Sequence, residues 1–278
     1  MIPPRWAPGI AGNTSVGLEE EVGTTRSSQD GCSVVFPSRR SIDKPTFERY
    51  ITVPFSHVHA QPVPPEQKKL CPKVILEGTR LTFKTEIAFA LNEHPRIVGP
   101  RKYRYHSPII SAEWCAFTNF PWGRGLINFE PQEEALAMET YQTWARLFEL
   151  QRYYSWIIDR FHLSTQMHQY LAYGKRIDFG WLEDRLLPLG FRLVFCTRSA
   201  DSFASARAER LKVSGNPKQY TDLSVFKREQ ELLEDLVAAS RLPVMTLDIS
   251  GNDVPAAVER IADWLASTGG LVMEDGVD

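Results

Sequence analysis

The sequence predicts an α/β protein in which helices cover both faces of a parallel β-sheet. From about residue 71 onward, short apolar segments alternate with longer segments of helical periodicity, which is the order expected for parallel strands joined by helices. A glycine-containing loop follows the first apolar segment, and the first 70 residues lack a sustained apolar pattern. These observations predict one folded domain over residues 71–278 and an extension over residues 1–70.

The extension is rich in Pro, Gly, Ser and Thr and carries the acidic run Glu19-Glu20-Glu21. Such a composition buries too little apolar area to offset the entropy of ordering the chain. We therefore expect residues 1–70 to be largely disordered, with one short strand at residues 50–55, and to be dispensable for folding.

Bulk composition excludes several functional classes. The net charge is −2, with 43% hydrophobic and 24% charged residues, which is ordinary for a soluble globular protein and gives no general affinity for nucleic acid. No uninterrupted apolar run reaches about 18 residues, so no membrane span is expected. The N-terminus lacks a secretory core, and the four cysteines lack the short spacing of a zinc or redox site. We expect a cytoplasmic protein.

Apolar periodicity assigns the elements. Strands are predicted at residues 73–77, 96–99, 155–158, 192–196 and 244–248. Helices are predicted at residues 84–92, 132–153, 179–187, 202–212, 223–240 and 254–267. The longest predicted helix is amphipathic, with apolar residues at helical spacing: Leu136, Met138, Tyr141, Trp144, Leu147 and Phe148. Core positions are predicted for Trp144, Tyr153, Tyr154 and Trp156.

The loop after the first strand is spaced like a phosphate-binding loop that lacks one glycine. Gly78, Lys84 and Thr85 match the pattern Gly-x-x-x-x-Gly-Lys-Ser/Thr, but Phe83 stands where the second glycine belongs. In such loops, backbone N–H groups wrap the phosphates, the lysine adds positive charge, and the hydroxyl ligates Mg²⁺. A Cβ at position 83 restricts positive φ, and the ring narrows the loop. The alternative is an ordinary strand–turn–helix in which these residues coincide by chance.

Three further segments resemble those of thymidylate and deoxynucleoside kinases. Asp159-Arg160-Phe161 follows the third strand and resembles the Asp-Arg-Tyr/Phe segment of that family. The helix after the fourth strand resembles the family's lid and carries Arg207 and Arg210. Residues 242–248 and the helix after them resemble the family's fifth strand and final helix. With Leu76-Glu77-Gly78, the resemblance covers roughly residues 73–267 in the family's order.

This resemblance to P-loop nucleotide kinases implies a P-loop NTPase-like, three-layer α/β/α fold with a five-stranded parallel sheet. It implies ATP and Mg²⁺ as cofactors and a small-molecule phosphate acceptor, and it is compatible with a homodimer. The loop that holds the nucleotide would comprise Gly78, Thr79, Arg80, Leu81, Thr82, Phe83, Lys84 and Thr85.

The resemblance also implies a role for each matched charged residue. Lys84 would contact the phosphates from an exposed turn, and Thr85 would bind Mg²⁺. Asp159 would bind Mg²⁺ through water or orient the acceptor, and Arg160 would contact the transferring or acceptor phosphate. Arg207 and Arg210 would stabilise charge from the lid. Phosphoryl transfer requires mainly positioning and positive charge, so this set of residues suffices chemically.

The acceptor site is less clearly predicted. Arg101, Arg104 and Tyr105 follow the predicted second strand and could bind an anionic group and a ring, or they could belong to a solvated loop or edge strand. Glu113-Trp114 could supply a base and a stacking face, although a packed Trp and an exposed Glu are favoured. His162 could contact the acceptor, although a structural hydrogen bond is favoured.

The sequence therefore predicts an ATP- and Mg²⁺-dependent kinase of a nucleoside, a nucleotide or a similar small metabolite. One alternative is a non-catalytic nucleotide-binding module whose loop is weakened by Phe83. A second is an NTPase switch, which is disfavoured because no water-orienting Gln motif is found.

Overall fold

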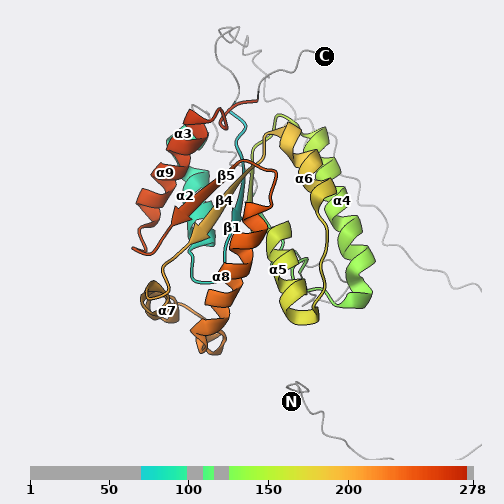
Figure 1. The fold of residues 1–278 in the computed structure, drawn as a ribbon. Helices are drawn as coiled ribbons and strands as arrows, with labels where there is room; N and C mark the ends of the chain where they lie inside the picture. Colours follow the sequence, from blue (N-terminus) through green and yellow to red (C-terminus); the bar gives the residue numbers. More distant parts are fainter. Residues whose placement is uncertain (1–69, 99–108, 116–124, 274–278) are drawn as a thin grey trace, which may run out of the picture. The chain divides into compact units, whose positions relative to one another are not determined.

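A computed structural model of the chain describes residues 70–98, 109–115 and 125–273 (Figure 1). Five strands form one sheet in the order β2-β3-β1-β4-β5, and every neighbouring pair is parallel. The strands are β1 (Lys73–Glu77), β2 (Ile109–Ser111), β3 (Trp156–Asp159), β4 (Arg192–Thr197) and β5 (Val244–Asp248). The predicted fold class is confirmed.

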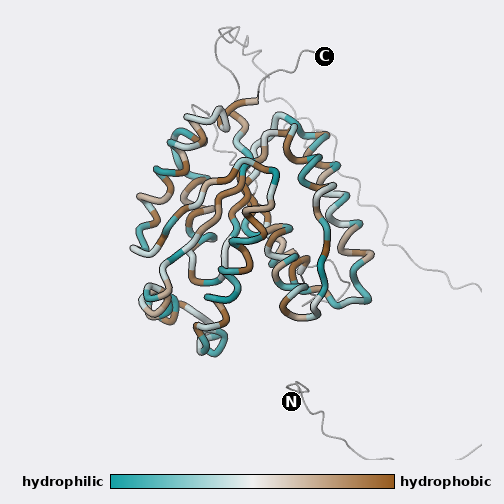
Figure 2. Tube along the Cα trace, viewed as in Figure 1, coloured by the Kyte–Doolittle hydropathy of each residue, from teal (hydrophilic) through white to brown (hydrophobic). Residues whose placement is uncertain are grey.

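Helices cover both faces of the sheet. On one face lie α2 (Lys84–Glu93) and α9 (Val254–Ser267); on the other lie α4 (Glu134–Leu150), α5 (His162–Tyr173), α6 (Gly180–Leu186) and α8 (Leu223–Ala238). Successive residues of β1 point to opposite faces, so Val74 and Leu76 pack in the core under α2 and α9, whereas Ile75 packs in the core under α4 and α5. The hydrophobic residues concentrate along the sheet between these helices (Figure 2).

Short elements complete the fold. Helix α7 (Ser202–Leu211) follows β4, and a 3-10 turn, η3 (Pro217–Tyr220), follows α7. Helix α7 is the segment that the sequence predicts as a lid, and residues 202–220, from α7 through η3, are called the lid below. The remaining elements are α3 (Pro95–Val98), η1 (Pro131–Glu133) and η2 (Leu187–Leu189).

The predicted second strand at residues 96–99 is wrong. Residues Pro95–Val98 form the short helix α3, and the edge strand β2 lies at Ile109–Ser111. Pro95 suits the first position of a helical turn, because its fixed φ matches the helix and its missing N–H would have no helical partner there. Arg96 then pairs with Glu259 and Asp263 on α9 at 2.8 Å and 2.6 Å, so this segment is bound to a helix and not to the sheet.

Two other expectations differ from the structure. Helix α5 was not predicted, because its sequence has no capping side chain of its own and no clear apolar stripe at its start. Tyr153 and Tyr154, predicted as core residues, have exposed fractions of 44% and 40%. They follow the end of α4 at Leu150, so the helical spacing that placed them in the core no longer applies.

The predicted extension, including the short strand expected at residues 50–55, lies outside the described residues, apart from Leu70, which forms an antiparallel bridge with Val272. Within the described part of the chain, no helix has both the length and the apolar character that a membrane span requires.

Candidate functional site

The candidate phosphate loop connects β1 to α2. Gly78 has a φ of 147°, and a Cβ at this position would lie 2.5 Å from the carbonyl oxygen of Cys196 on β4. Only glycine permits this backbone approach. The loop is closed by Thr82, whose Oγ1 donates a hydrogen bond of 2.8 Å to the carbonyl oxygen of Thr79. The first glycine of the motif is therefore required by the contact between the loop and β4.

Phe83 adopts a left-handed backbone conformation, which glycine reaches without strain. Its φ and ψ are 54° and 27°, in the left-handed region, and it directly precedes α2. This conformation is costly for a residue with a Cβ. The ring is partly buried and packs against both the core under α2 and the lid residues. No side chain in the described residues caps α2, so the first N–H groups of the helix point toward a site suited to an anion.

Lys84 is buried, which contradicts the prediction of an exposed position. Its side chain folds back over the loop, and its Nζ donates to the carbonyl oxygen of Thr79 at 2.7 Å and to Thr82 Oγ1 at 3.1 Å. Burial, together with the charge of Arg160, lowers the pKa of Lys84 to about 8. Both hydrogen-bond partners are neutral, so the charge of the ammonium is not cancelled by them and remains available to an anionic ligand.

Thr85 and Asp159 meet from two different strand ends. Thr85 lies in the first turn of α2, Asp159 is the last residue of β3, and Thr85 Oγ1 donates to Asp159 Oδ2 at 2.6 Å. The other carboxylate oxygen, Asp159 Oδ1, is buried and has no hydrogen-bond partner among the described residues. A hydroxyl and a carboxylate are ligands that Mg²⁺ accepts. The described residues contain no group of three or more His, Cys, Asp or Glu side chains that could form a complete metal cage.

The turn between β3 and α5 depends on a buried carboxylate of β1. Glu77 is fully buried, and its Oε1 accepts hydrogen bonds from the backbone N–H groups of Phe161, Leu163 and Ser164 at 2.9, 3.1 and 3.3 Å. Its Oε2 accepts a further bond from the Ser164 hydroxyl. Glu77 thus caps α5 from outside the helix. Sequence analysis assigned no role to this residue.

Arg160 projects from the same turn into an ion-pair cluster. It has a φ of 61° and is 5% exposed, and its Nε lies 3.0 Å from Glu113 Oε2. The other oxygen of Glu113 lies 3.6 Å from Arg80 of the phosphate loop. Burial alone would raise the pKa of Glu113, but Arg160 and Arg80 outweigh it and hold that pKa below its usual range. Glu113 is therefore a half-buried anion between two arginines.

The neighbouring Trp114 is 79% exposed. The favoured expectation of a packed Trp and an exposed Glu is therefore wrong for this pair. The short strand β2 ends at Ser111, and the residues after it bring Glu113 toward the ends of β1 and β3. This position of Glu113 was not predicted, because the second strand was placed at residues 96–99.

The lid places one of its two predicted arginines at the site. Arg210 Nη1 pairs with Glu86 on α2 at 3.0 Å, and its Nε donates to the Tyr220 hydroxyl at 3.2 Å. The hydrogen bond to Tyr220, more than any other contact, raises the pKa of Arg210 above its usual value. Arg207 instead reaches the carbonyl oxygen of Thr221, at 3.5 Å, and does not line the site.

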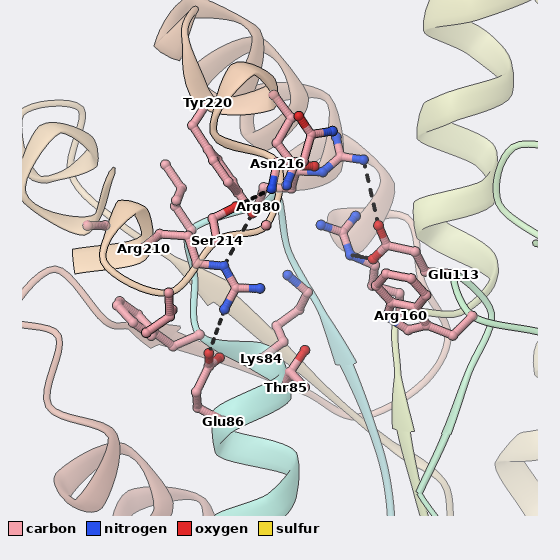
Figure 3. A pocket seen from close by; sticks show the side chains of 17 residues that line it. Arg80, Lys84, Thr85, Glu86, Glu113, Arg160, Arg210, Ser214, Asn216 and Tyr220 are labelled. Carbon is pink, nitrogen blue, oxygen red and sulfur yellow. Dashed lines mark hydrogen bonds and ion pairs between the residues drawn. The ribbon is translucent and has the colours of Figure 1, made fainter. Parts of the chain in front are cut away.

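These side chains line one cavity of about 430 Å³ (Figure 3). Lys84 and Thr85 lie at its base, the Arg160–Glu113 pair lies on one side, and Arg210 with Glu86 lies on the opposite side. The rest of the lining comes mainly from the lid, including Ser214, Asn216 and Tyr220. Among the described residues, four cations and two carboxylates thus surround a space large enough for a small phosphorylated molecule.

The predicted site residues fall into three groups. Lys84, Thr85, Asp159, Arg160 and Arg210 gather at the carboxyl ends of β1 and β3 and under the lid, as do the loop residues Gly78, Thr79, Arg80, Leu81, Thr82 and Phe83. His162 and Arg207 are placed elsewhere: His162 is fully buried and bonds to Glu183 on α6 at 2.9 Å, and Arg207 reaches Thr221 outside the cavity. The predicted acceptor residues Arg101, Arg104 and Tyr105 lie outside the described residues.

Sequence reasoning missed four contributors: Glu77, Glu86, Tyr220 and Asn216. Glu86 could have been found from its place directly after Lys84-Thr85, in the first turn of the helix. The lid residues carry no sequence signal, because they approach the loop only through the tertiary fold.

No family model matches the sequence, and no curated protein matches it. Comparison with solved structures does return similar folds. The YorR protein of Bacillus subtilis, in complex with phosphorylated GDP, is 18% identical, with a TM-score of 0.49 over 70% of this chain and 96% of that one. Deoxyadenosine kinase of M. mycoides with bound dATP is 12% identical, with a TM-score of 0.43 over 70% and 99% of the two chains.

Thymidylate kinase of Candida albicans is 13% identical, with a TM-score of 0.40 over 75% of this chain and 97% of that one. A gluconokinase of Sinorhizobium meliloti is 14% identical, with a TM-score of 0.39. Identities and TM-scores as low as these say nothing about the ligand of this chain. The function of this chain must therefore be inferred from the residues of the cavity.

Proposed function

We propose that this chain is a phosphotransferase of the nucleotide-kinase type that uses ATP and Mg²⁺. The acceptor would be a nucleoside, a nucleotide or a similar small hydroxylated metabolite. The observation that carries the proposal is the pair of Thr85 Oγ1 and Asp159 Oδ2, 2.6 Å apart beside the buried ammonium of Lys84. A hydroxyl, a carboxylate and a lysine converge in this way where a magnesium-bound triphosphate is held.

The residues present fit Mg²⁺. Asp159 Oδ1 is a buried carboxylate oxygen that accepts no hydrogen bond from the described residues. The other oxygen of the same carboxylate, Oδ2, accepts the hydrogen bond from Thr85. Mg²⁺ typically takes only one or two protein ligands and completes its shell with phosphate oxygens and water. In that position it would neutralise charge on the β- and γ-phosphates. Thr85 and Asp159 are the residues that would hold it.

The remaining side chains suit the transferring group and the acceptor. Lys84 would exchange its bonds to Thr79 and Thr82 for phosphate oxygens, and the open N–H groups of α2 would bind the same oxygens. Arg160 and Arg210 would stabilise the charge on the transferring phosphoryl group from opposite sides of the cavity. Glu113, ionised at neutral pH, would accept a hydrogen bond from the acceptor hydroxyl and orient it.

A transfer assay tests this proposal. The full chain, ATP and Mg²⁺ would be incubated with panels of nucleosides, nucleotides and sugars, and phosphorylated products would be sought. Lys84→Ala should abolish transfer and remove ATP-induced thermal stabilisation, while its circular dichroism stays unchanged. The matched control is Lys175→Ala, because Lys175 pairs with Glu134 far from the cavity and should behave as wild type. Undiminished ATP binding by Lys84→Ala would contradict the assignment of the phosphate loop.

A second candidate function is nucleotide binding without turnover. It is favoured by one observation, the left-handed Phe83 in the place of a glycine. ATP-induced stabilisation that requires Lys84, without product from any acceptor and without phosphate release, would support this candidate over the kinase.

A further inference from the structure

Arg198 lies next to Phe83 and can offset the strain of its left-handed backbone. Arg198 follows the end of β4, and the Cζ of its guanidinium lies 5.7 Å from the centroid of the Phe83 ring and 5.8 Å from that of Phe203 on α7. At these distances the cation attracts the faces of both rings. Phe83 is the only one of these two rings that belongs to the phosphate loop.

The guanidinium itself is held by two other segments, the start of α7 and the connection between β5 and α9. Its Nη1 donates to the carbonyl oxygen of Ser202 at 2.8 Å, and its Nη2 donates to the carbonyl oxygen of Ile249 at 3.2 Å and to Asn252 Oδ1 at 2.8 Å. The backbone N–H and carbonyl of Arg198 both bond to the side chain of Gln230 on α8, each at 3.0 Å. Arg198 is 2% exposed. The position of its guanidinium is therefore fixed, and the ring of Phe83 packs against it.

Arg198 does not line the cavity, whereas Phe83 does. An effect of Arg198 on a ligand can pass through Phe83, or through α7, which bonds to Arg198 at Ser202 and carries the cavity residue Arg210; variants at Phe83 separate the two routes. Burial lowers the pKa of Arg198 to about 10, so the side chain remains charged at neutral pH and the attraction to the ring persists.

We propose that Arg198 is a positioning residue that compensates for the missing glycine in the phosphate loop. By stacking on Phe83, it stabilises the left-handed backbone at that position and aims the first N–H groups of α2 at the phosphates. It also joins the loop to the connection between β5 and α9, through Ile249 and Asn252. The part concerning ligand affinity rests on the proposed function; the part concerning the loop's conformation does not.

A cycle of four proteins tests the proposal: wild type, Arg198→Met, Phe83→Gly, and the double variant. Methionine keeps an apolar stem but has neither charge nor planar donors. Glycine adopts a positive φ without support. Arg198→Met should therefore weaken binding of inorganic tripolyphosphate and of Mg-ATP by about tenfold when Phe83 is present, a factor within the range of a desolvated cation–π contact. In the Phe83→Gly background the same change should matter less than about twofold.

The control for global effects is Phe203→Leu. Arg198 lies at nearly the same distance from the Phe203 ring, but Phe203 belongs to the lid cluster and not to the loop, so this change should lower the thermal midpoint and weaken ligand binding by less than Arg198→Met does. Equal weakening by Arg198→Met in both backgrounds would overturn the proposal, because the arginine would then act independently of Phe83.

A second measurement needs no ligand. Amide hydrogen exchange of the peptide covering residues 79–85 should speed up in Arg198→Met and in Phe83→Leu, and should not change between Phe83→Gly and the double variant. If no protein of the set binds tripolyphosphate or ATP, the proposed function fails, and the exchange pattern alone decides on Arg198. Unchanged exchange in both Arg198→Met and Phe83→Leu would overturn its positioning role. Should Arg198→Met not fold, Phe83→Leu with Arg198 intact still gives this answer.

Discussion

The loop between β1 and α2 and the turn between β3 and α5 each lead into a helix, but different contacts stabilise the two helix starts. Each follows a buried strand, each starts a helix, and each contains a residue other than glycine with positive φ, at Phe83 and Arg160. The β3–α5 turn is held by the buried carboxylate of Glu77, which accepts three backbone N–H groups. No described side chain caps the helix after the β1–α2 loop, and an aromatic ring stacked on an arginine supports this loop.

The difference follows from what each helix end must do. A carboxylate at the start of α5 occupies its N–H groups permanently, which makes that turn rigid and part of the fold. The start of α2 has its N–H groups uncapped, so they can bind an anion. Support for α2 therefore has to come from the side of the loop that does not face the cavity, and this is where Arg198 lies. The start of α5, which contributes to stability, is capped and is called the closed end below. The start of α2, which is suited to binding, is uncapped and is called the open end.

The largest expected effect concerns the closed end. Glu77→Ala would leave buried N–H groups of α5 without an acceptor, and we expect the free energy of unfolding to fall by about 3 kcal/mol, a cost that reflects several unsatisfied donors. Urea denaturation would measure it, with Glu139→Ala on the exposed face of α4 as the control. Glu77→Gln, which retains an acceptor oxygen, should lose less. A loss below about 1 kcal/mol for Glu77→Ala would mean that water replaces the carboxylate and that the turn is not held as described.

The second effect concerns the side chain that the closed turn presents. Arg160→Gly removes the guanidinium while permitting the positive φ of the backbone, so that loss of charge is separated from added strain. If the proposed function holds, turnover should fall by at least about tenfold, in line with the value of charge contacts in a transition state. Arg207→Ala, which removes a lid arginine outside the cavity, should leave turnover unchanged. Equal losses in both variants would indicate that the lid and not the turn sets the rate.

The smallest effect concerns the open end. Lys84 has a pKa of about 8 in the ligand-free protein, and a bound phosphate would favour its charged form and raise that pKa. Below pH 7 the lysine is already protonated and binding should not depend on pH through this group. Above pH 8 the protein must take up a proton to bind, so ATP affinity should fall by about fivefold between pH 8 and pH 9.

Isothermal titration in two buffers of different ionisation enthalpy would measure this proton uptake. Lys84→Arg keeps its charge throughout this range and should bind ATP without proton uptake. The same uptake in Lys84→Arg as in the wild type would assign the proton to another group.

Local sequence patterns predicted most of the fold, because each pattern reports the face that an element buries. The strand at Lys73–Glu77, the strand at Val244–Asp248 and the helix at Val254–Ser267 have the predicted bounds. The second strand was misplaced because β2 has three residues, too few for a periodic signal. Helix α5 was not predicted because its cap, Glu77, lies on β1, far away in the sequence, so no local pattern indicates the start of the helix.

The sequence by itself determined the loop after β1, the Asp159-Arg160 segment after β3 and the order of the strands along the chain. Parallel strands end at one edge of the sheet, so residues after β1 and β3 must meet there once the order β2-β3-β1-β4-β5 forms. Only the tertiary structure decided that Lys84 is buried, that Glu113 lies between two arginines, and that Arg198 supports Phe83. These contacts join residues from different elements, and their energies depend on distance and burial, which exist only after the chain has folded.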